Sequence, residues 1–265
     1  GYGGAEVIIS SLTDTLVDRG YDVTLFASGD SKTKAKLFSV IERAPGLTRQ
    51  TMNNIGYNMK NLMNTFAVLE NADQFDIIHW HYCKDMTPIM FASIIKKPSL
   101  ITPHNHFGGQ DVADIAKYYK DVKYFVSISN SHRKQFPFDF VGTVYNGIDV
   151  KKLKFNSKPE KYLVWLGRFS KTKGAHEAIK IALKAGLPLK IAAPEDDGKY
   201  FKTEIEPYLG KKGIEYIGEV NFEEKDKLLG NAFAFVSPIS WEEPFGLAVP
   251  ESNACGTPII AYDRG

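Results

Sequence analysis

The sequence predicts an α/β protein in which parallel strands alternate with helices along the whole chain. Short apolar runs rich in β-branched and aromatic residues recur between helical patterns, and Gly, Pro, Asn or Asp bounds most of them. Strands that alternate regularly with helices form parallel sheets covered by helices on both faces. The 265 residues are enough for one large domain or for two domains of ordinary size.

The predicted strands fall into two groups separated by a polar stretch. The first group is 22–27, 76–80, 99–102, 124–127 and 143–145. The second group is 162–166, 189–193, 214–217, 232–236 and 258–261. Residues 149–159 between the groups are polar and irregular, which is typical of a linker. We therefore predict two Rossmann-like domains, 1–152 and 153–265, each built on a doubly wound parallel sheet.

Helical patterns lie between the strands. Residues 6–19 carry apolar side chains on one side and stop at Gly20, which is a common residue just after a helix. Residues 173–185 show the same pattern and stop at Gly186. A long helix is predicted within 48–71.

Composition and charge exclude several classes of protein. The hydrophobic and charged fractions, 43% and 24%, are those of a soluble globular protein, and a net charge of +2 gives no support for a nucleic-acid partner. No apolar run reaches the length of a membrane span, so membrane association is unsupported. Cys83 and Cys255 lie in predicted elements rather than in a disulfide framework, which predicts a reducing, cytoplasmic location.

The run 242–251, Glu-Glu-Pro-Phe-Gly-Leu-Ala-Val-Pro-Glu, carries the strongest functional signal. It lies between two predicted strands, and a helix beginning near Gly246 would direct unpaired N–H groups at an anion. The carboxylates of Glu243 and Glu251 can each accept hydrogen bonds from a pair of vicinal hydroxyls. Phosphate on amides and hydroxyls on carboxylates describe a nucleotide sugar. The alternative is that both acids lie on the surface, as most acids do.

A second signal follows the strand predicted at 162–166. The loop Gly-Arg-Phe-Ser-Lys-Thr-Lys-Gly, residues 167–174, lies where open α/β sheets bind ligands. Within it, Arg168 can hold a phosphate through two hydrogen bonds, and Lys173 adds a compact second charge. The alternative is a solvated basic loop.

Two further signals lie in the first half. Gly3 and Gly4 open a helix, where small residues let a phosphate approach the backbone, although a plain helix-capping turn would use the same residues. His104 directly follows a predicted strand and could bond a substrate hydroxyl or the charge that develops at a reacting carbon. The histidines at 79, 81, 104 and 106 come in i, i+2 pairs without a completing Asp or Cys cluster, so no metal site is predicted. His79 is expected to be a buried strand residue with a satisfied ring.

Taken together, these motifs resemble the retaining glycosyltransferases of family four. Residues 75–81, Phe-Asp-Ile-Ile-His-Trp-His, and 146–149, Asn-Gly-Ile-Asp, are also similar to family motifs. The resemblance covers nearly the whole chain and implies a GT-B architecture, in which two Rossmann-like domains face a cleft. The family continues further at both ends, so we expect the second domain to be incomplete at its C-terminal end.

The resemblance also implies a role for each site residue. It implies catalytic roles for His104 and Glu243, with no metal and no cofactor. It implies donor-binding roles for Gly3, Gly4, Arg168, Lys173, Glu243, Phe245, Gly246, Leu247 and Glu251. The implied reaction is metal-independent hexosyl transfer from a nucleoside diphosphate sugar to a hydroxyl of a carbohydrate, lipid or small molecule. Rival readings are a nucleotide-sugar epimerase or hydrolase of the same fold, or a non-catalytic nucleotide-sugar binding module.

Overall fold

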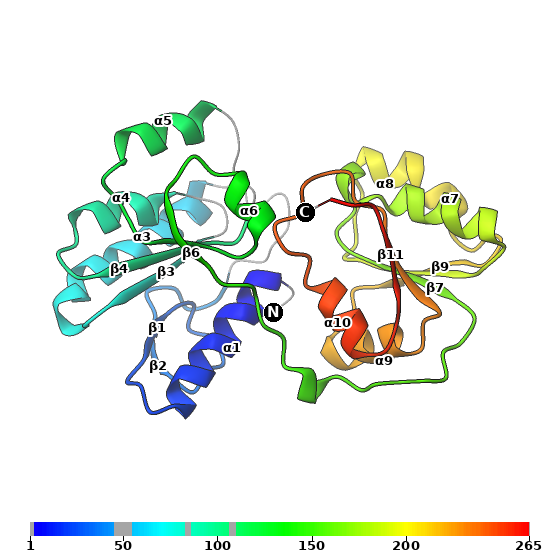
Figure 1. Ribbon diagram of the computed structural model, residues 1–265, viewed down its shortest axis with the longest axis horizontal. Helices are drawn as coiled ribbons and strands as arrows, with labels where there is room; N and C mark the ends of the chain where they lie inside the picture. The colour runs from blue at the N-terminus through cyan, green and yellow to red at the C-terminus, as the bar shows by residue number, and fades with distance from the viewer. Residues whose placement is uncertain (1–2, 45–54, 83–85, 106–109, 265) are drawn as a thin grey trace. The chain divides into compact units, whose positions relative to one another are not determined.

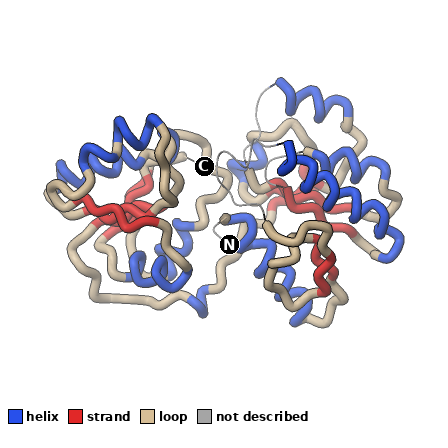
Figure 2. The backbone as a smooth tube through the Cα atoms, turned by 180° about the vertical axis from the view of Figure 1, so that it is seen from behind, coloured by secondary structure: helices blue, strands red, loops and turns tan. Residues whose placement is uncertain are grey.

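Every strand pairing among the described residues, which are 3–44, 55–82, 86–105 and 110–264 of the computed structural model, is parallel. The chain divides into two units, Gly1–Asn146 and Gly147–Gly265. In each unit helices flank the strands (Figures 1 and 2). The parallel α/β class predicted from the sequence is therefore confirmed.

Unit 1 contains two parallel sheets, a two-stranded one of order β1-β2 and a four-stranded one of order β3-β4-β5-β6. Its elements in chain order are α1 (Gly4–Asp18), β1 (Thr24–Phe26), β2 (Lys36–Phe38), α3 (Ile55–Asn71), η1 (Ala72–Gln74), β3 (Ile78–Tyr82), α4 (Thr87–Ile94), β4 (Ser99–Pro103), α5 (Gln110–Tyr118), β5 (Phe125–Ser127), α6 (Asn130–Lys134) and β6 (Phe140–Thr143). Its core gathers apolar side chains such as Trp80, Ile101 and Phe125.

Unit 2 is a five-stranded parallel sheet of order β11-β10-β7-β8-β9. Its elements are η2 (Val150–Lys152), β7 (Leu163–Leu166), η3 (Lys171–Lys173), α7 (Ala175–Ala185), β8 (Leu189–Ala192), α8 (Lys199–Glu204), η4 (Glu206–Tyr208), β9 (Ile214–Gly218), α9 (Phe222–Gly230), β10 (Ala234–Ser237), α10 (Ala248–Ala254) and β11 (Ile259–Ala261). The order reverses after β9, because β10 pairs with β7 on its other side. Ligands of such sheets bind at the carboxyl ends of the strands beside that reversal.

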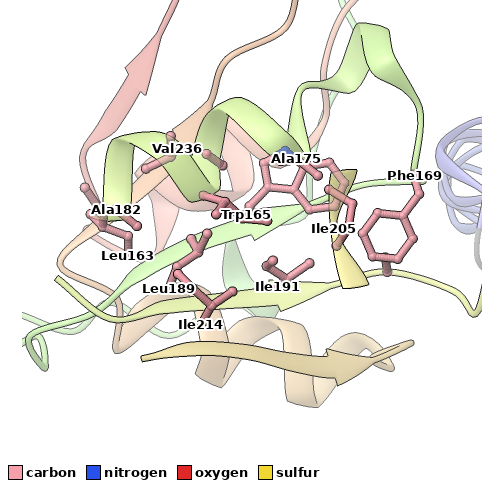
Figure 3. Close-up of a cluster of buried hydrophobic side chains, with 14 residues drawn as sticks. Leu163, Trp165, Phe169, Ala175, Ala182, Leu189, Ile191, Ile205, Ile214 and Val236 are labelled. Atoms are coloured by element: carbon pink, nitrogen blue, oxygen red, sulfur yellow. The ribbon is translucent and has the colours of Figure 1, made fainter. Parts of the chain in front are cut away.

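A core of fully buried side chains fixes those strands under α7. Figure 3 shows Leu163 and Trp165 of β7, Leu189 and Ile191 of β8, and Ala175 of α7 in this cluster. Each is no more than 2% exposed. A second cluster on α9 and α10 includes other side chains of β7, β8 and β10. The strand ends that carry the basic loop therefore rest on a rigid base.

Several strands begin or end at other residues than predicted. The strand predicted at 76–80 runs from Ile78 to Tyr82, because its register pairs Ile78 with Ser99. The strand predicted at 143–145 lies earlier, at Phe140–Thr143. The strand β2 was not predicted, since only three residues with little burial form it. Of the helix predicted within 48–71, the described part runs from Ile55 to Asn71.

The stretch predicted as a linker is bonded to unit 2. Leu153 is buried in its core, and the backbone N–H of Lys154 donates to Asp226 Oδ1 at 2.8 Å. The N–H of Asn156 donates to the carbonyl of Cys255 at 2.9 Å. The domain boundary predicted at 152/153 stays a prediction. None of the helices described here is long and apolar enough to cross a membrane.

Candidate functional site

Two loops of unit 2 meet at the carboxyl ends of β7 and β10. The N–H of Ser240, in the loop after β10, donates to the carbonyl oxygen of Thr172 in the loop after β7 at 2.9 Å. Gly174 has φ +75°, and a Cβ at that position would lie 2.2 Å from the Pro238 carbonyl oxygen. Only glycine tolerates both this backbone conformation and this close approach. The loops that carry the two sequence signals are therefore locked side by side.

Within these loops an acid, a lysine and a tryptophan form one network. Lys173 Nζ lies 2.6 Å from Glu243 Oε2. Trp241 Nε1–H donates to the same oxygen at 2.7 Å, and Lys173 Nζ lies 5.3 Å from the centre of the indole ring. The Lys173 and Glu243 side chains are 27% and 16% exposed, so Glu243 is not an ordinary surface acid. The sequence analysis missed Trp241, whose only signal was an indole two residues before that acid.

Arg168 is the second cation of the basic loop. Its side chain is exposed, and no hydrogen bond or ion pair of its guanidinium occurs among the described residues. An Arg without a carboxylate partner at a strand end can turn its planar donors toward a diphosphate. Arg168 and Lys173 thus lie in one short loop, five residues apart.

Glu251 lies in a different environment, on α10. It is 6% exposed, and its Oε1 lies 2.5 Å from Lys225 Nζ of α9. A nearly buried carboxylate needs such a partner, because removing an unpaired charge from water is costly. The structure therefore excludes the surface-acid alternative for Glu251 as well. No sequence motif pointed to Lys225 as its partner.

The helix after Glu243 begins later than predicted. Leu247 is the N-cap, and α10 starts at Ala248, so Phe245 and Gly246 precede the helix. Gly246 has φ +75°, a left-handed conformation that turns the chain away from a helical path. Among the described residues, the N–H groups of Gly246 and Leu247 donate no hydrogen bond. They are available to an anionic ligand, although not as the first turn of a helix.

In unit 1, Gly3 and Gly4 occupy the start of α1. Gly3 is the N-cap, with extended backbone and no side-chain cap, and Gly4 is the first helical residue. This position suits a helix-capping turn, and the Glu6 carboxylate lies against Gly3, where a phosphate would have to displace it. Their role in donor binding stays a prediction.

His104 follows β4 in unit 1, where it was expected. It is 8% exposed, and its Nε2 lies 2.9 Å from His81 Nδ1. Burial, followed by the charges of His132 and His79, lowers the pKa of His104 from 6.5 to about 4. The ring is therefore neutral at physiological pH. His79 bonds Thr102 Oγ1 at 2.8 Å, but its side chain is exposed, so the expectation of burial was wrong. Strand alternation turns Ile78 and Trp80 inward and His79 outward.

His132 supports the segment after His104, and the sequence analysis did not find it. The ring is fully buried, and Nδ1 accepts the Ile128 N–H at 3.4 Å. Nε2 must then carry the hydrogen, which it donates to the carbonyl oxygen of Asn105 at 3.2 Å. This tautomer fixes the backbone next to His104.

We expect the pH dependence of stability to report the buried state of His104. In the unfolded chain His104 is protonated below about pH 6.5, whereas in the folded protein it is protonated only below about pH 4. The unfolded state therefore binds more protons between these pH values, and the free energy of unfolding falls as the pH drops from about 6.5 to about 4. The full shift is worth on the order of 3 kcal/mol. Urea titrations near pH 7.5 and pH 5 should show a smaller loss for His104→Gln than for the wild type. An equal loss in both proteins would contradict the burial of this group.

Metal-ligating and thiol groups give no further site. No cluster of three His, Cys, Asp or Glu residues with metal-binding geometry occurs in the described ranges. Cys255 is fully buried, and burial, followed by a hydrogen bond to Asp226, raises its pKa to about 12. Cys83 and His106 lie outside the described residues.

Comparison with known proteins places these features in one family. The family model described as Glycosyltransferase Family 4 matches residues 2–152, and that described as Glycosyl transferases group 1 matches residues 147–265. A curated relative is the phosphatidyl-myo-inositol mannosyltransferase of Propionibacterium freudenreichii subsp. shermanii. It is 21% identical over 98% of this chain and 73% of its own length.

Solved structures match the fold over the whole chain. The Anabaena protein Alr3699/HepE, solved in complex with UDP and glucose, superposes with a TM-score of 0.73 at 19% identity, covering 100% of this chain and 78% of its own. AviGT4, a glycosyltransferase of avilamycin A biosynthesis, gives a TM-score of 0.71 at 22% identity, covering 100% and 73%. These matches confirm the predicted two-domain GT-B architecture.

Proposed function

Because this chain belongs to glycosyltransferase family 4, whose members transfer a sugar from a nucleotide sugar, we propose that it moves a hexose from a nucleoside diphosphate sugar to an acceptor hydroxyl with retention of anomeric configuration. The observation that carries the proposal is the pairing of Lys173 with Glu243 at the carboxyl end of the sheet, in a loop that also carries Arg168, for which the described residues offer no ion pair. Cations that can bind phosphate thus lie next to an acid, Glu243, that can bind hydroxyls.

We assign the diphosphate to the cations. Arg168 and Lys173 bind its oxygens, and the N–H groups of Gly246 and Leu247, which follow Glu243 in the same loop, add neutral donors. As the bond from the anomeric carbon to the diphosphate oxygen breaks, negative charge grows on that oxygen. Once the donor is bound, these groups are in place before the bond breaks, so they stabilise the charge with little further reorganisation. Gly3 and Gly4, with the start of α1, are proposed as a further approach for the phosphates.

We assign the sugar to Glu243 and His104, and the ribose to Glu251. A carboxylate accepts hydrogen bonds from sugar hydroxyls, and these strengthen as the ring gains oxocarbenium character. His104, neutral because it is buried, donates or accepts one hydrogen bond without adding a positive charge beside the developing cation. Glu251 takes the two ribose hydroxyls, with Lys225 Nζ paired to its Oε1.

The reaction proceeds on one face of the sugar. The bond between the anomeric carbon and the leaving oxygen breaks, and both electrons leave with the diphosphate. The acceptor oxygen then bonds to the same face, and its proton passes to an oxygen of the departing phosphate. No carboxylate nucleophile is required, because Glu243 and Glu251 are assigned to hydroxyls of the sugar and of the ribose. Exclusion of water from the donor would limit hydrolysis.

A donor screen read out by product mass tests this proposal and separates it from its rivals. The intact protein is incubated with UDP-, GDP- and ADP-hexoses in the presence and absence of glycan, lipid and small-molecule acceptors. A product heavier than the acceptor by one hexose supports transfer. Consumption of donor without acceptor would indicate an epimerase or hydrolase, and binding without turnover would indicate a binding module. Either of these outcomes overturns the proposed transfer.

Activity is expected to survive a strong chelator, because the charge on the leaving group is met by Arg168, Lys173 and backbone N–H groups. Transfer rates are compared in the same enzyme preparation before and after treatment with EDTA. Complete loss of transfer activity after EDTA treatment, restored by magnesium or manganese, would contradict the metal-independent mechanism.

Glu251→Gln is expected to weaken binding of any nucleoside diphosphate roughly tenfold, because an amide bonds vicinal hydroxyls less strongly than a carboxylate does. Calorimetry compares it with Lys225→Met, which leaves the carboxylate in place but removes its partner, and folding of both variants is checked by circular dichroism. An unchanged affinity in a folded Glu251→Gln protein would remove the ribose assignment.

A further inference from the structure

The network around Glu243 contains a residue to which the proposed reaction has given no role. Trp241 is half-buried and lies between β10 and the acid. Its indole N–H and the Lys173 ammonium converge on one carboxylate oxygen, Oε2, at 2.7 and 2.6 Å. In the described part of the chain the other oxygen, Oε1, has no hydrogen bond or ion pair. Oε2 of Glu243 is thus held by two donors, and Oε1 is available to a ligand.

The indole and the ammonium differ in what a ligand can do to them. An ammonium on a flexible stem moves readily to a stronger anion, and a diphosphate carries more charge than one carboxylate. An indole N–H is a neutral donor, so a diphosphate does not draw it away by charge. When Lys173 turns to a diphosphate, Trp241 is the remaining donor on Oε2.

Gly246 also packs against the acid. A Cβ built on Gly246 would have Glu243 Cγ as its nearest neighbour, at 3.4 Å. The stem of Glu243 therefore packs against the glycine backbone, while its carboxylate meets the indole. Together these contacts restrict the orientation of the carboxylate.

We propose that Trp241 is a positioning residue that anchors Oε2 of Glu243, so that Oε1 stays directed at the transferred sugar after Lys173 has moved to the diphosphate. This inference rests on the proposed function, which places the sugar at Glu243 and the diphosphate at Lys173. The hydrogen bond from Trp241 to Glu243 is observed in the structure. In this proposal the indole N–H of Trp241 acts on the reaction through Glu243, and the indole ring lies beside the Lys173 ammonium.

Two substitutions separate the N–H from the ring. Trp241→Phe keeps an aromatic face for Lys173 and removes the donor, whereas Trp241→Leu removes both. With the donor sugar that the mass screen identifies, Trp241→Phe should lower kcat roughly tenfold, as loss of a group that orients a functional ligand does. The affinity for UDP, which lacks the sugar, should change less than about twofold. Trp241→Leu should in addition weaken UDP binding, because Lys173 loses its support.

A double-mutant cycle tests whether Trp241 acts through Glu243. The Trp241→Phe, Glu243→Gln protein should turn over as slowly as Glu243→Gln alone, since the carboxylate that the anchor positions is already missing. Additive losses in the double variant, or an unchanged kcat in Trp241→Phe, would overturn the inference. If Trp241 only stabilised the fold, Trp241→Phe would lower kcat by the same factor in the wild type and in Glu243→Gln.

Indole ¹⁵N–H spectra test the anchor without any donor. Trp241→Phe assigns the signal among the three tryptophans of the chain. Glu243→Gln should shift the Trp241 signal and leave that of Trp80 unchanged, because among the described tryptophans only Trp241 donates to this carboxylate. Trp165 donates to the carbonyl oxygen of Lys173 at 3.1 Å and is not used as the control. A Trp241 signal that does not respond would overturn the anchor even if transfer is active. If the screen finds no transfer while the signal shifts, the anchor stands and the proposed function fails.

Discussion

Glu243→Gln is expected to lower turnover on the order of a hundredfold while leaving the affinity for a nucleoside diphosphate nearly intact. Its proposed partner is the transferred sugar, and a contact to the part that changes in the transition state appears in the rate rather than in ground-state binding. Losing one preorganised polar group at a reacting centre typically costs a factor of this size. The amide still accepts the indole N–H, so the loop keeps its shape.

Single-turnover rates and UDP titrations on the same protein preparations measure the two effects. Glu242→Gln is the matched control, because it is the neighbouring acid, and its ion pair with Arg264 is half exposed and worth little. If Glu243→Gln weakens UDP binding strongly and leaves turnover unchanged, the assignments of Glu243 and Glu251 are interchanged. No effect on either quantity would remove the main support for the sugar contact.

Arg168→Ala is expected to weaken nucleoside diphosphate binding roughly ten- to hundredfold and to flatten its salt dependence. Two unit charges at contact interact by about 4 kcal/mol at an effective dielectric near 20, and the net value of a charge-assisted hydrogen bond is about 1.5 to 3 kcal/mol. The side chain is exposed and has no partner in the described structure, so its removal should not affect folding.

Lys173→Met tests the second cation of the loop, but this substitution also changes the surroundings of Glu243. It leaves Glu243 without its ion pair, so a stability measurement must accompany the titration. Lys171→Ala is the control, since Lys171 is an exposed cation in the same 3-10 turn. Calorimetry at low and high salt ranks the variants. Equal affinities for Arg168→Ala, Lys173→Met and Lys171→Ala would exclude this loop as the diphosphate site.

Local pattern was enough to predict the strand and loop order of this chain. Buried strands such as 163–166 and 189–192 are apolar runs bounded by turn residues, so their positions follow from side-chain chemistry over a few neighbours. The loop with Arg168 and Lys173 was predicted at a strand end for the same reason. Errors occurred where local pattern was weak, as at the short, little-buried strand β2.

The partners of the site residues came only from the tertiary structure. Lys173 and Glu243 are 70 residues apart, Lys225 and Glu251 are 26 apart, and no local preference specifies either pair. The sequence supplied the charged residues and the strands that carry them. Which lysine meets which acid, which oxygen Trp241 holds, and that His104 is buried beside His81 were decided by the packing of the sheets, because hydrogen bonds and burial depend on groups that only folding brings together.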